Sequence, residues 1–157
     1  IYGEYKANNA QEVSEMWEQV KLKEKGGNKT VLAGIPESLP ALVKAYRIQD
    51  KVANVGFDWE KREDVWAKVK EEIAEFEVEV DHMDEAKATE EMGDLIFALV
   101  NAARLYNIRP DNALEKTNAK FIKRFNYIEQ KAKEKGQSLN EMTLDEMEAL
   151  WQEAKKA

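Results

Sequence analysis

Cysteine is absent from this 157-residue sequence, and histidine occurs once, at His82. Without cysteine there can be no disulfide framework, and one histidine with no thiolate leaves a zinc site without the ligands that zinc prefers. No apolar run approaches the length of a membrane span, and the sequence opens with no signal-peptide pattern. We therefore expect a protein of the reducing cytoplasm with no membrane partner.

The sequence also has fewer positively charged than negatively charged residues. Twenty-four Lys and Arg residues stand against 31 Asp and Glu, which gives a net charge of −7. Because duplex binding needs a basic surface, we expect no nucleic-acid polymer as a partner. With 43% hydrophobic and 35% charged residues, the composition is typical of a globular domain with a core rather than of a disordered chain. An anionic substrate would have to be bound by a metal ion and by local basic residues.

The sequence does contain strong helical periodicity. Apolar residues recur at steps of three and four, and strict alternation over the length of a strand is missing, which predicts an all-α antiparallel helical bundle. Capping and stop signals place helices at about 9–25, 38–55, 63–80, 84–106, 111–135 and 143–151. In the second of these, Ser38 is the expected N-cap and Pro40 lies in the first turn. Only a few residues around His82 separate the third and fourth helices, so these two should pack as an antiparallel hairpin.

Two acidic clusters lie at helical spacing on this predicted hairpin: Glu71-Glu72-x-x-Glu75 and Glu91-x-x-Asp94. Residues three positions apart share a helix face, so each cluster directs two carboxylates the same way. Two like charges about 4 Å apart repel by roughly 4 kcal/mol at an effective dielectric near 20. Four converging carboxylates must therefore be protonated, spread apart or bridged by a cation. An all-oxygen ligand set suits Mg²⁺, with Mn²⁺ as a substitute.

These motifs and the strings around them resemble the MazG-type nucleoside triphosphate pyrophosphohydrolases, an all-α superfamily. The resemblance covers nearly the whole chain and is closest to the C-terminal repeat of two-repeat members. It implies that residues 1–25 are the closing helix of a preceding repeat, 26–37 a linker and 38–157 the catalytic helical domain. Besides the acidic motifs it includes Ile35-Pro36-x-Ser38-Leu39-Pro40, Val55-Gly56-Phe57-Asp58-Trp59, Asn118-x-Lys120-Phe121-x-x-Arg124-Phe125 and Met147-x-x-Leu150-Trp151.

The resemblance implies Mg²⁺-dependent hydrolysis of ribo- and deoxynucleoside triphosphates, with broad base preference, to the monophosphate and pyrophosphate. Carried over by motif, the metal ligands and catalytic residues are Glu72, Glu75, Glu91 and Asp94. The implied substrate contacts are Lys21, Lys68, Glu71, Lys87, Lys120, Lys123, Arg124 and Trp151.

Several of these assignments have a structural alternative. The basic residues of helix 111–135 also fit a solvated basic face, and Trp151 fits a core aromatic as well as a platform for a base. Glu71 faces away from Glu72 on the helix and fits a solvated acid.

Other functions remain open at this point. A pyrimidine-selective dUTP or dCTP pyrophosphatase would carry the same acidic motifs. A redox di-metal centre is disfavoured because helical bundles build it from Glu-x-x-His pairs, and neither motif has that histidine. A non-catalytic helical dimerisation or regulatory module would leave the acids merely solvated. The helix at 84–106 is apolar around so much of its circumference that we expect a homodimer to bury it.

Overall fold

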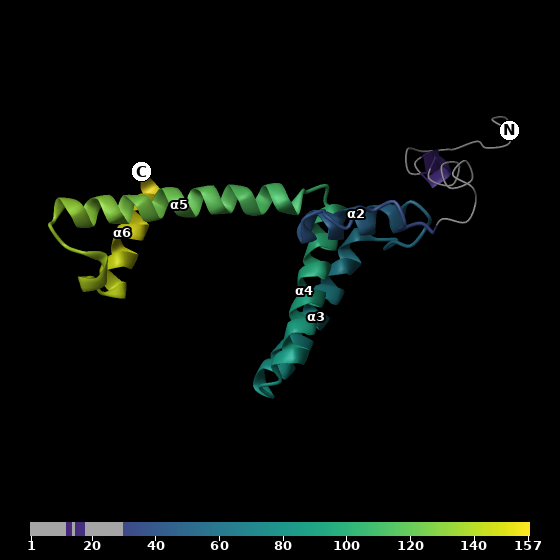
Figure 1. The fold of residues 1–157 in the computed structure, drawn as a ribbon, viewed down its shortest axis with the longest axis horizontal. Helices are drawn as coiled ribbons and strands as arrows, with labels where there is room; N and C mark the ends of the chain where they lie inside the picture. Colours follow the sequence, from purple (N-terminus) through teal and green to yellow (C-terminus); the bar gives the residue numbers. More distant parts are fainter. Residues whose placement is uncertain (1–11, 14, 18–29) are drawn as a thin grey trace. The chain divides into compact units, whose positions relative to one another are not determined.

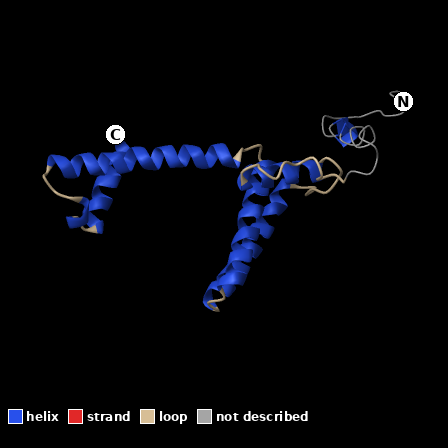
Figure 2. Ribbon diagram, viewed as in Figure 1, coloured by secondary structure: helices blue, strands red, loops and turns tan. Residues whose placement is uncertain are grey.

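The computed structural model describes residues 12, 13, 15–17 and 30–157, and in this part of the chain every regular element is helical and no strand occurs (Figures 1 and 2). The all-α prediction is confirmed. The chain divides into two compact units, Ile1–Pro110 and Asp111–Ala157. Residues 12, 13 and 15–17 are helical. The rest of the helix predicted at 9–25, including Lys21, lies outside the described residues. Among the described helices none is long and apolar enough to cross a membrane.

The first unit contains α2, α3 and α4, with a short 3-10 helix, η1, immediately before α3 (Figure 1). The predicted hairpin is confirmed: α3 and α4 run side by side and are joined by a tight turn at His82, which is exposed. The bounds are α2 Ala41–Ala53, η1 Arg62–Asp64, α3 Val65–Asp81 and α4 Glu85–Leu105.

Helix α2 begins later than the sequence predicted. Its N-cap is Pro40, whose ψ of 143° is extended, and Ser38 makes no capping hydrogen bond to it. A residue before proline is pushed away from the helical region, so Leu39 cannot belong to the first turn. The first backbone hydrogen bond of the helix runs from Lys44 N to the Pro40 carbonyl at 2.8 Å. The prediction that Ser38 caps this helix was therefore wrong.

A residue with left-handed backbone, Gly56, follows the end of helix α2. Gly56 has φ of 97°, and beside it Phe57 N donates to the Val52 carbonyl at 2.9 Å. This pair of features is the Schellman ending, which satisfies carbonyls that the helix leaves without partners. The same arrangement ends α3 at Met83, α4 at Asn107 and, in the second unit, the following helix at Gly136. Sequence signals predicted the two glycine positions.

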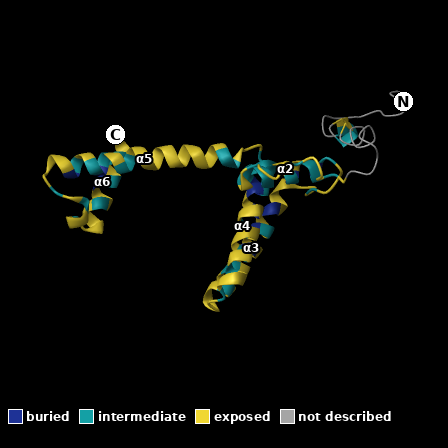
Figure 3. Ribbon diagram, in the orientation of Figure 1, coloured by how far each residue is buried: buried dark blue, intermediate teal, exposed yellow. Residues whose placement is uncertain are grey.

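The core of the first unit lies between α3 and α4. Val65, Val69, Ala98 and Ala102 are buried against one another, and the buried positions gather at the end of the hairpin that adjoins α2 (Figure 3). The buried positions of α3 are Val65, Val69 and Glu72, whereas the apolar Ile73 next to Glu72 is exposed.

A partly buried ion pair joins the loop after α2 to α4. The Arg104 guanidinium donates to both carboxylate oxygens of Asp58, at 2.5 and 3.3 Å, and also to Asn101 Oδ1. The side chains of Arg104 and Asp58 are 9% and 17% exposed. An ion pair in this environment is strong because little water competes with it, and losing one partner leaves the other charge uncompensated.

We expect Arg104→Ala to destabilise the protein by about 3 kcal/mol, because Asp58 would keep its charge in a mostly buried position. The measurement is urea unfolding followed by circular dichroism. Arg47→Ala is the matched control, since Arg47 is exposed on α2 and its loss should cost less than about 0.5 kcal/mol. Equal midpoints for the two variants would contradict the structural role of the pair.

The second unit consists of two helices and the loop that joins them. Helix α5, Pro110–Glu134, is followed by the 3-10 helix η2, Leu139–Glu141, and by α6, Leu144–Lys156. Ile128 and Ala132 of α5 and Leu150 of α6 are the buried residues of this unit. The helix predicted from residue 143 begins with Thr143 as its N-cap, whose Oγ1 accepts a hydrogen bond from Glu146 N at 3.1 Å.

Candidate metal centre

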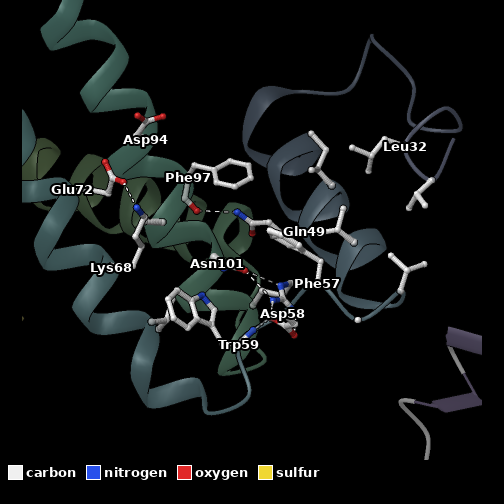
Figure 4. Close-up of a pocket in the computed structure, with 18 of the residues that line it drawn as sticks. Leu32, Gln49, Phe57, Asp58, Trp59, Lys68, Glu72, Asp94, Phe97 and Asn101 are labelled. Carbon is white, nitrogen blue, oxygen red and sulfur yellow. Dashed lines mark hydrogen bonds and ion pairs between the residues drawn. The ribbon is translucent and has the colours of Figure 1, made fainter.

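Three carboxylates converge where the acidic part of α3 faces α4. Glu72, Glu91 and Asp94 each offer one oxygen, and these atoms all lie within 4.8 Å of one another. Glu72 comes from α3 and the other two from α4, so the antiparallel pairing of the hairpin brings the two sequence motifs together. Figure 4 shows Glu72 and Asp94 from neighbouring helices beside a cavity. The spacing suits one cation held by several oxygen ligands.

The electrostatics of this cluster leave negative charge uncompensated. Glu72 is only 5% exposed, and its Oε2 and the Oε2 of Glu91 are buried with no hydrogen-bond partner among the described residues. Loss of hydration, followed by the nearby carboxylates of Glu75 and Asp94, raises the pKa of Glu91 above its ordinary value. Two buried acceptors without donors fit a hard divalent cation, which would satisfy both at once.

Glu75, the fourth predicted ligand, lies beside the cluster rather than inside it. Its carboxylate acts on Glu91 strongly enough to raise the pKa of that group. The Glu75 side chain is exposed, however, and is not one of the three groups whose oxygens converge. The structure therefore brings three predicted ligands together and places the fourth next to them.

Lys68 forms ion pairs with Glu71 and Glu72 at one side of the cluster. Its Nζ lies 3.0 Å from Glu72 Oε1 and 3.2 Å from a carboxylate oxygen of Glu71. Hydrogen bonds from Lys68 to these two glutamates raise the pKa of its ammonium group. One oxygen of Glu72 is thus fixed by Lys68, while the other stays available to a cation. Lys87 is exposed in the first turn of α4, where its backbone N–H donates to the capping Asp84.

The remaining predicted contacts lie in the second unit. Lys120 and Lys123 are exposed on α5. The Arg124 guanidinium lies 5.5 Å from the centre of the Trp151 ring, and the Phe121 ring packs against the same tryptophan at 5.1 Å. Trp151 is half-buried, so it combines a packing role with a partly open ring.

A cavity of about 1160 Å³ extends from the carboxylates toward α2 (Figure 4). Lys68, Glu72 and Asp94 form part of its wall, and most of the rest is apolar. Two further polar residues of this wall, Gln49 and Asn101, were not predicted from the sequence. Asn101 follows Asp94 by seven positions, two helical turns on the same face, so its spacing was a usable signal. Gln49 carried no such signal.

Part of the chain matches the model of a known protein family. Residues 60–128 match the MazG nucleotide pyrophosphohydrolase domain. This segment resembles a MazG-type domain. The matched segment includes all four predicted metal ligands and the three predicted basic contacts of α5, Lys120, Lys123 and Arg124, and it ends before Trp151.

Three proteins similar to this chain are longer than it. A protein of Escherichia coli K12 named nucleoside triphosphate pyrophosphohydrolase is 41% identical over 160 residues, covering 99% of this chain and 61% of that protein. The nucleoside triphosphate pyrophosphohydrolase/pyrophosphatase MazG of Thermotoga maritima is 38% identical, covering 88% of this chain and 54% of the relative. The uncharacterized protein YabN of Bacillus subtilis is 46% identical, covering 99% and 32%. The chain therefore spans less than two thirds of each relative.

Proposed function

We propose that this MazG-type domain hydrolyses nucleoside triphosphates to the monophosphate and pyrophosphate with Mg²⁺ as its cofactor and Mn²⁺ as a substitute. The observation that carries the proposal is the convergence of Glu72, Glu91 and Asp94, with two buried oxygens left without donors. The names of the relatives from Escherichia coli and Thermotoga maritima support the same reaction.

Each acidic residue has a proposed part in this reaction. Glu72, Glu91 and Asp94 hold the cation, and Glu75 completes the set or takes a proton from the attacking water. A bound divalent cation neutralises charge on the triphosphate and lowers the pKa of water near it. Lys68 orients Glu72 through their 3.0 Å ion pair and contributes positive charge beside the phosphates.

Basic side chains outside the cluster are the proposed phosphate contacts. Arg124 carries a planar guanidinium that can grip two phosphate oxygens at once, while Lys120 and Lys123 supply point charges. We assign supporting roles to Lys21, Lys87 and Glu71 on the family resemblance.

We also propose that the domain works as a homodimer in the cytoplasm. Ile96 and Leu99 of α4 are 45% and 46% exposed in the single chain, although they belong to its most apolar segment. An isologous pairing would bury this face. The assignment of residues 1–25 to a preceding repeat stays a prediction from the sequence.

Turnover of a nucleotide panel tests the proposed reaction. We expect every common ribo- and deoxynucleoside triphosphate to be hydrolysed in Mg²⁺, with rates within about tenfold of one another, because the cation acts on the triphosphate that all of them share. Excess chelator should stop all of them. Turnover confined to dUTP or dCTP would instead assign the domain to the pyrimidine-selective class, and no turnover would favour a regulatory module.

A further inference from the structure

Helix α2 has a polar residue at a position where packing favours an apolar one. Its two buried residues are Gln49 and Ala53, which lie four positions apart and so share one face of the helix. Helix α2 packs on α4, but neither residue belongs to the buried apolar cluster that α3 and α4 form between them. The buried part of this face therefore consists of one methyl group and one glutamine.

A hydrogen bond joins this glutamine to the backbone of α4. Gln49 is 3% exposed, and its Nε2 donates to the Phe97 carbonyl at 2.9 Å (Figure 4). Because a carbonyl can only accept, the bond fixes which way the amide points. The opposite atom, Oε1, is also buried and has no donor among the described residues. A buried acceptor without a partner lowers stability, and an apolar residue of similar size would avoid that cost.

Apolar contacts alone would define the register of α2 on α4 poorly. Apolar burial is non-directional, and a residue as small as Ala53 fits several positions along a neighbouring helix. A hydrogen bond to one carbonyl is directional, so it is lost when the helix slides or rotates. Single buried polar residues fix the register of coiled-coil helices in this way, at a cost in stability. Gln49 is therefore placed to select one position of α2.

The bond acts beside the cation cluster. Asp94 lies three positions before Phe97 in the same turn of α4, and both residues line the cavity that adjoins the cluster. On the other side of this cavity, α2 contributes Gln49 and Val52. The position of α2 relative to this turn of α4 consequently sets the width of the cavity near Asp94.

The ion pair of Asp58 with Arg104 acts at a different place. It fixes the loop after α2, and Gly56, with its left-handed backbone, lies between that loop and the helix. A fixed loop on the far side of such a turn does not by itself set the rotation of the helix. The register of α2 still needs a contact made by the helix.

We propose that Gln49 is a positioning residue, whose bond to the Phe97 carbonyl fixes the register of α2 on α4 and so defines one wall of the cavity beside Asp94. The bond selects one arrangement of that wall at the cost of an unpaired buried acceptor. The expected effect on turnover rests on the proposed function, whereas the expected effect on α2 does not.

The variant Gln49→Leu separates this role from ordinary stabilisation. Leucine has a similar size and no polar atom in its side chain, so the variant no longer buries an acceptor without a donor. We expect it to unfold at the urea concentration of the wild type or at a higher one. Gln130→Leu, which replaces an exposed glutamine on α5, is the matched control and should keep the wild-type midpoint.

Methyl NMR of the full chain reports the register directly. Val52 follows Gln49 by three positions and lines the cavity, while Val69 is buried in α3. We expect one set of Val52 methyl signals in the wild type and in Gln130→Leu. In Gln49→Leu these signals should split or broaden while those of Val69 stay unchanged, because α2 then occupies more than one position on an intact hairpin.

Steady-state kinetics with ATP and Mg²⁺ link the register to the reaction. In Gln49→Leu we expect KM to rise about three- to tenfold, because losing one buried hydrogen bond lowers the share of chains in the wild-type register by about this factor. The value of kcat should change less than about twofold, because the acids of α3 and α4 stay in place. A purely structural role would not separate KM from kcat in this way.

Sharp Val52 signals at their wild-type shifts in Gln49→Leu would overturn the proposal, because α2 would then keep its register without the bond. A lower urea midpoint with altered Val69 signals, or a variant that does not fold, would also overturn it, because Gln49 would then belong to the general packing of the unit. The proposed hydrolase function fails separately, if the wild type does not cleave ATP while the Val52 signals still respond to Gln49→Leu.

Discussion

Replacing Glu72 with glutamine or Asp94 with asparagine should lower the rate of pyrophosphate release about a thousandfold and leave the helical content unchanged. Both substitutions keep the size of the side chain and remove one negative charge from the cation cluster. Charge stabilisation by a catalytic metal is worth several kcal/mol, and each 1.36 kcal/mol corresponds to about tenfold in rate. Initial rates in excess Mg²⁺, with circular dichroism of the same samples, measure both effects.

Acids on the same two helices provide the controls for this experiment. Glu90→Gln removes a charge next to Glu91, and Asp81→Asn removes one at the end of α3, and both residues are exposed outside the cluster. These variants should retain activity within about threefold of the wild type, because surface substitutions of this kind are usually mild. Wild-type rates in the Glu72 and Asp94 variants would refute the assignment of the catalytic site.

Mg²⁺ should stabilise the wild-type chain and reverse the effect of Glu91→Gln on stability. In chelator, Glu91→Gln should melt above the wild type, because it removes a charge that lies near Glu75, Glu72 and Asp94 with a buried oxygen lacking a donor. In excess Mg²⁺ the order should invert, because the wild type gains binding energy that the variant has lost. A cation at 100 times its dissociation constant adds about 2.7 kcal/mol to the stability of the wild type.

Thermal melts of both chains, with and without the cation, measure this inversion. Glu90→Gln again serves as the control and should follow the wild type in both conditions. A wild-type melting temperature that is independent of metal and of nucleotide would support the non-catalytic helical module instead.

The sequence was most informative where local rules decide the structure. The short connection at His82 predicted the hairpin, and Thr143 predicted the start of the last helix. The spacing of the acids predicted four neighbouring carboxylates, of which Glu72, Glu91 and Asp94 converge while Glu75 lies beside them. These features depend on neighbours a few residues apart, which periodicity and capping describe well. Pro40 shows that one local rule can override another, since the restriction it places on Leu39 outweighed the capping preference of Ser38.

Features that join distant segments could not be predicted in the same way. The pairing of Arg104 with Asp58 and the bond from Gln49 to the Phe97 carbonyl link residues 46 and 48 positions apart. Neither partner stands out in the sequence, because an arginine or a glutamine on a helix is usually solvated. The burial of Glu72 was not predicted either, because one residue turns a side chain by about 100° around the helix and spacing alone does not decide whether Glu72 or Ile73 faces the packed side.

The most direct test of the central claim is to follow the hydrolysis of ATP by phosphorus NMR, with the wild type and Asp94→Asn side by side in Mg²⁺. We predict that the wild type produces AMP and pyrophosphate in equal amounts, that chelator stops the reaction, and that Asp94→Asn produces neither at a comparable rate. Release of orthophosphate with ADP, or equal turnover by the two chains, would contradict a pyrophosphohydrolase centred on Glu72, Glu91 and Asp94.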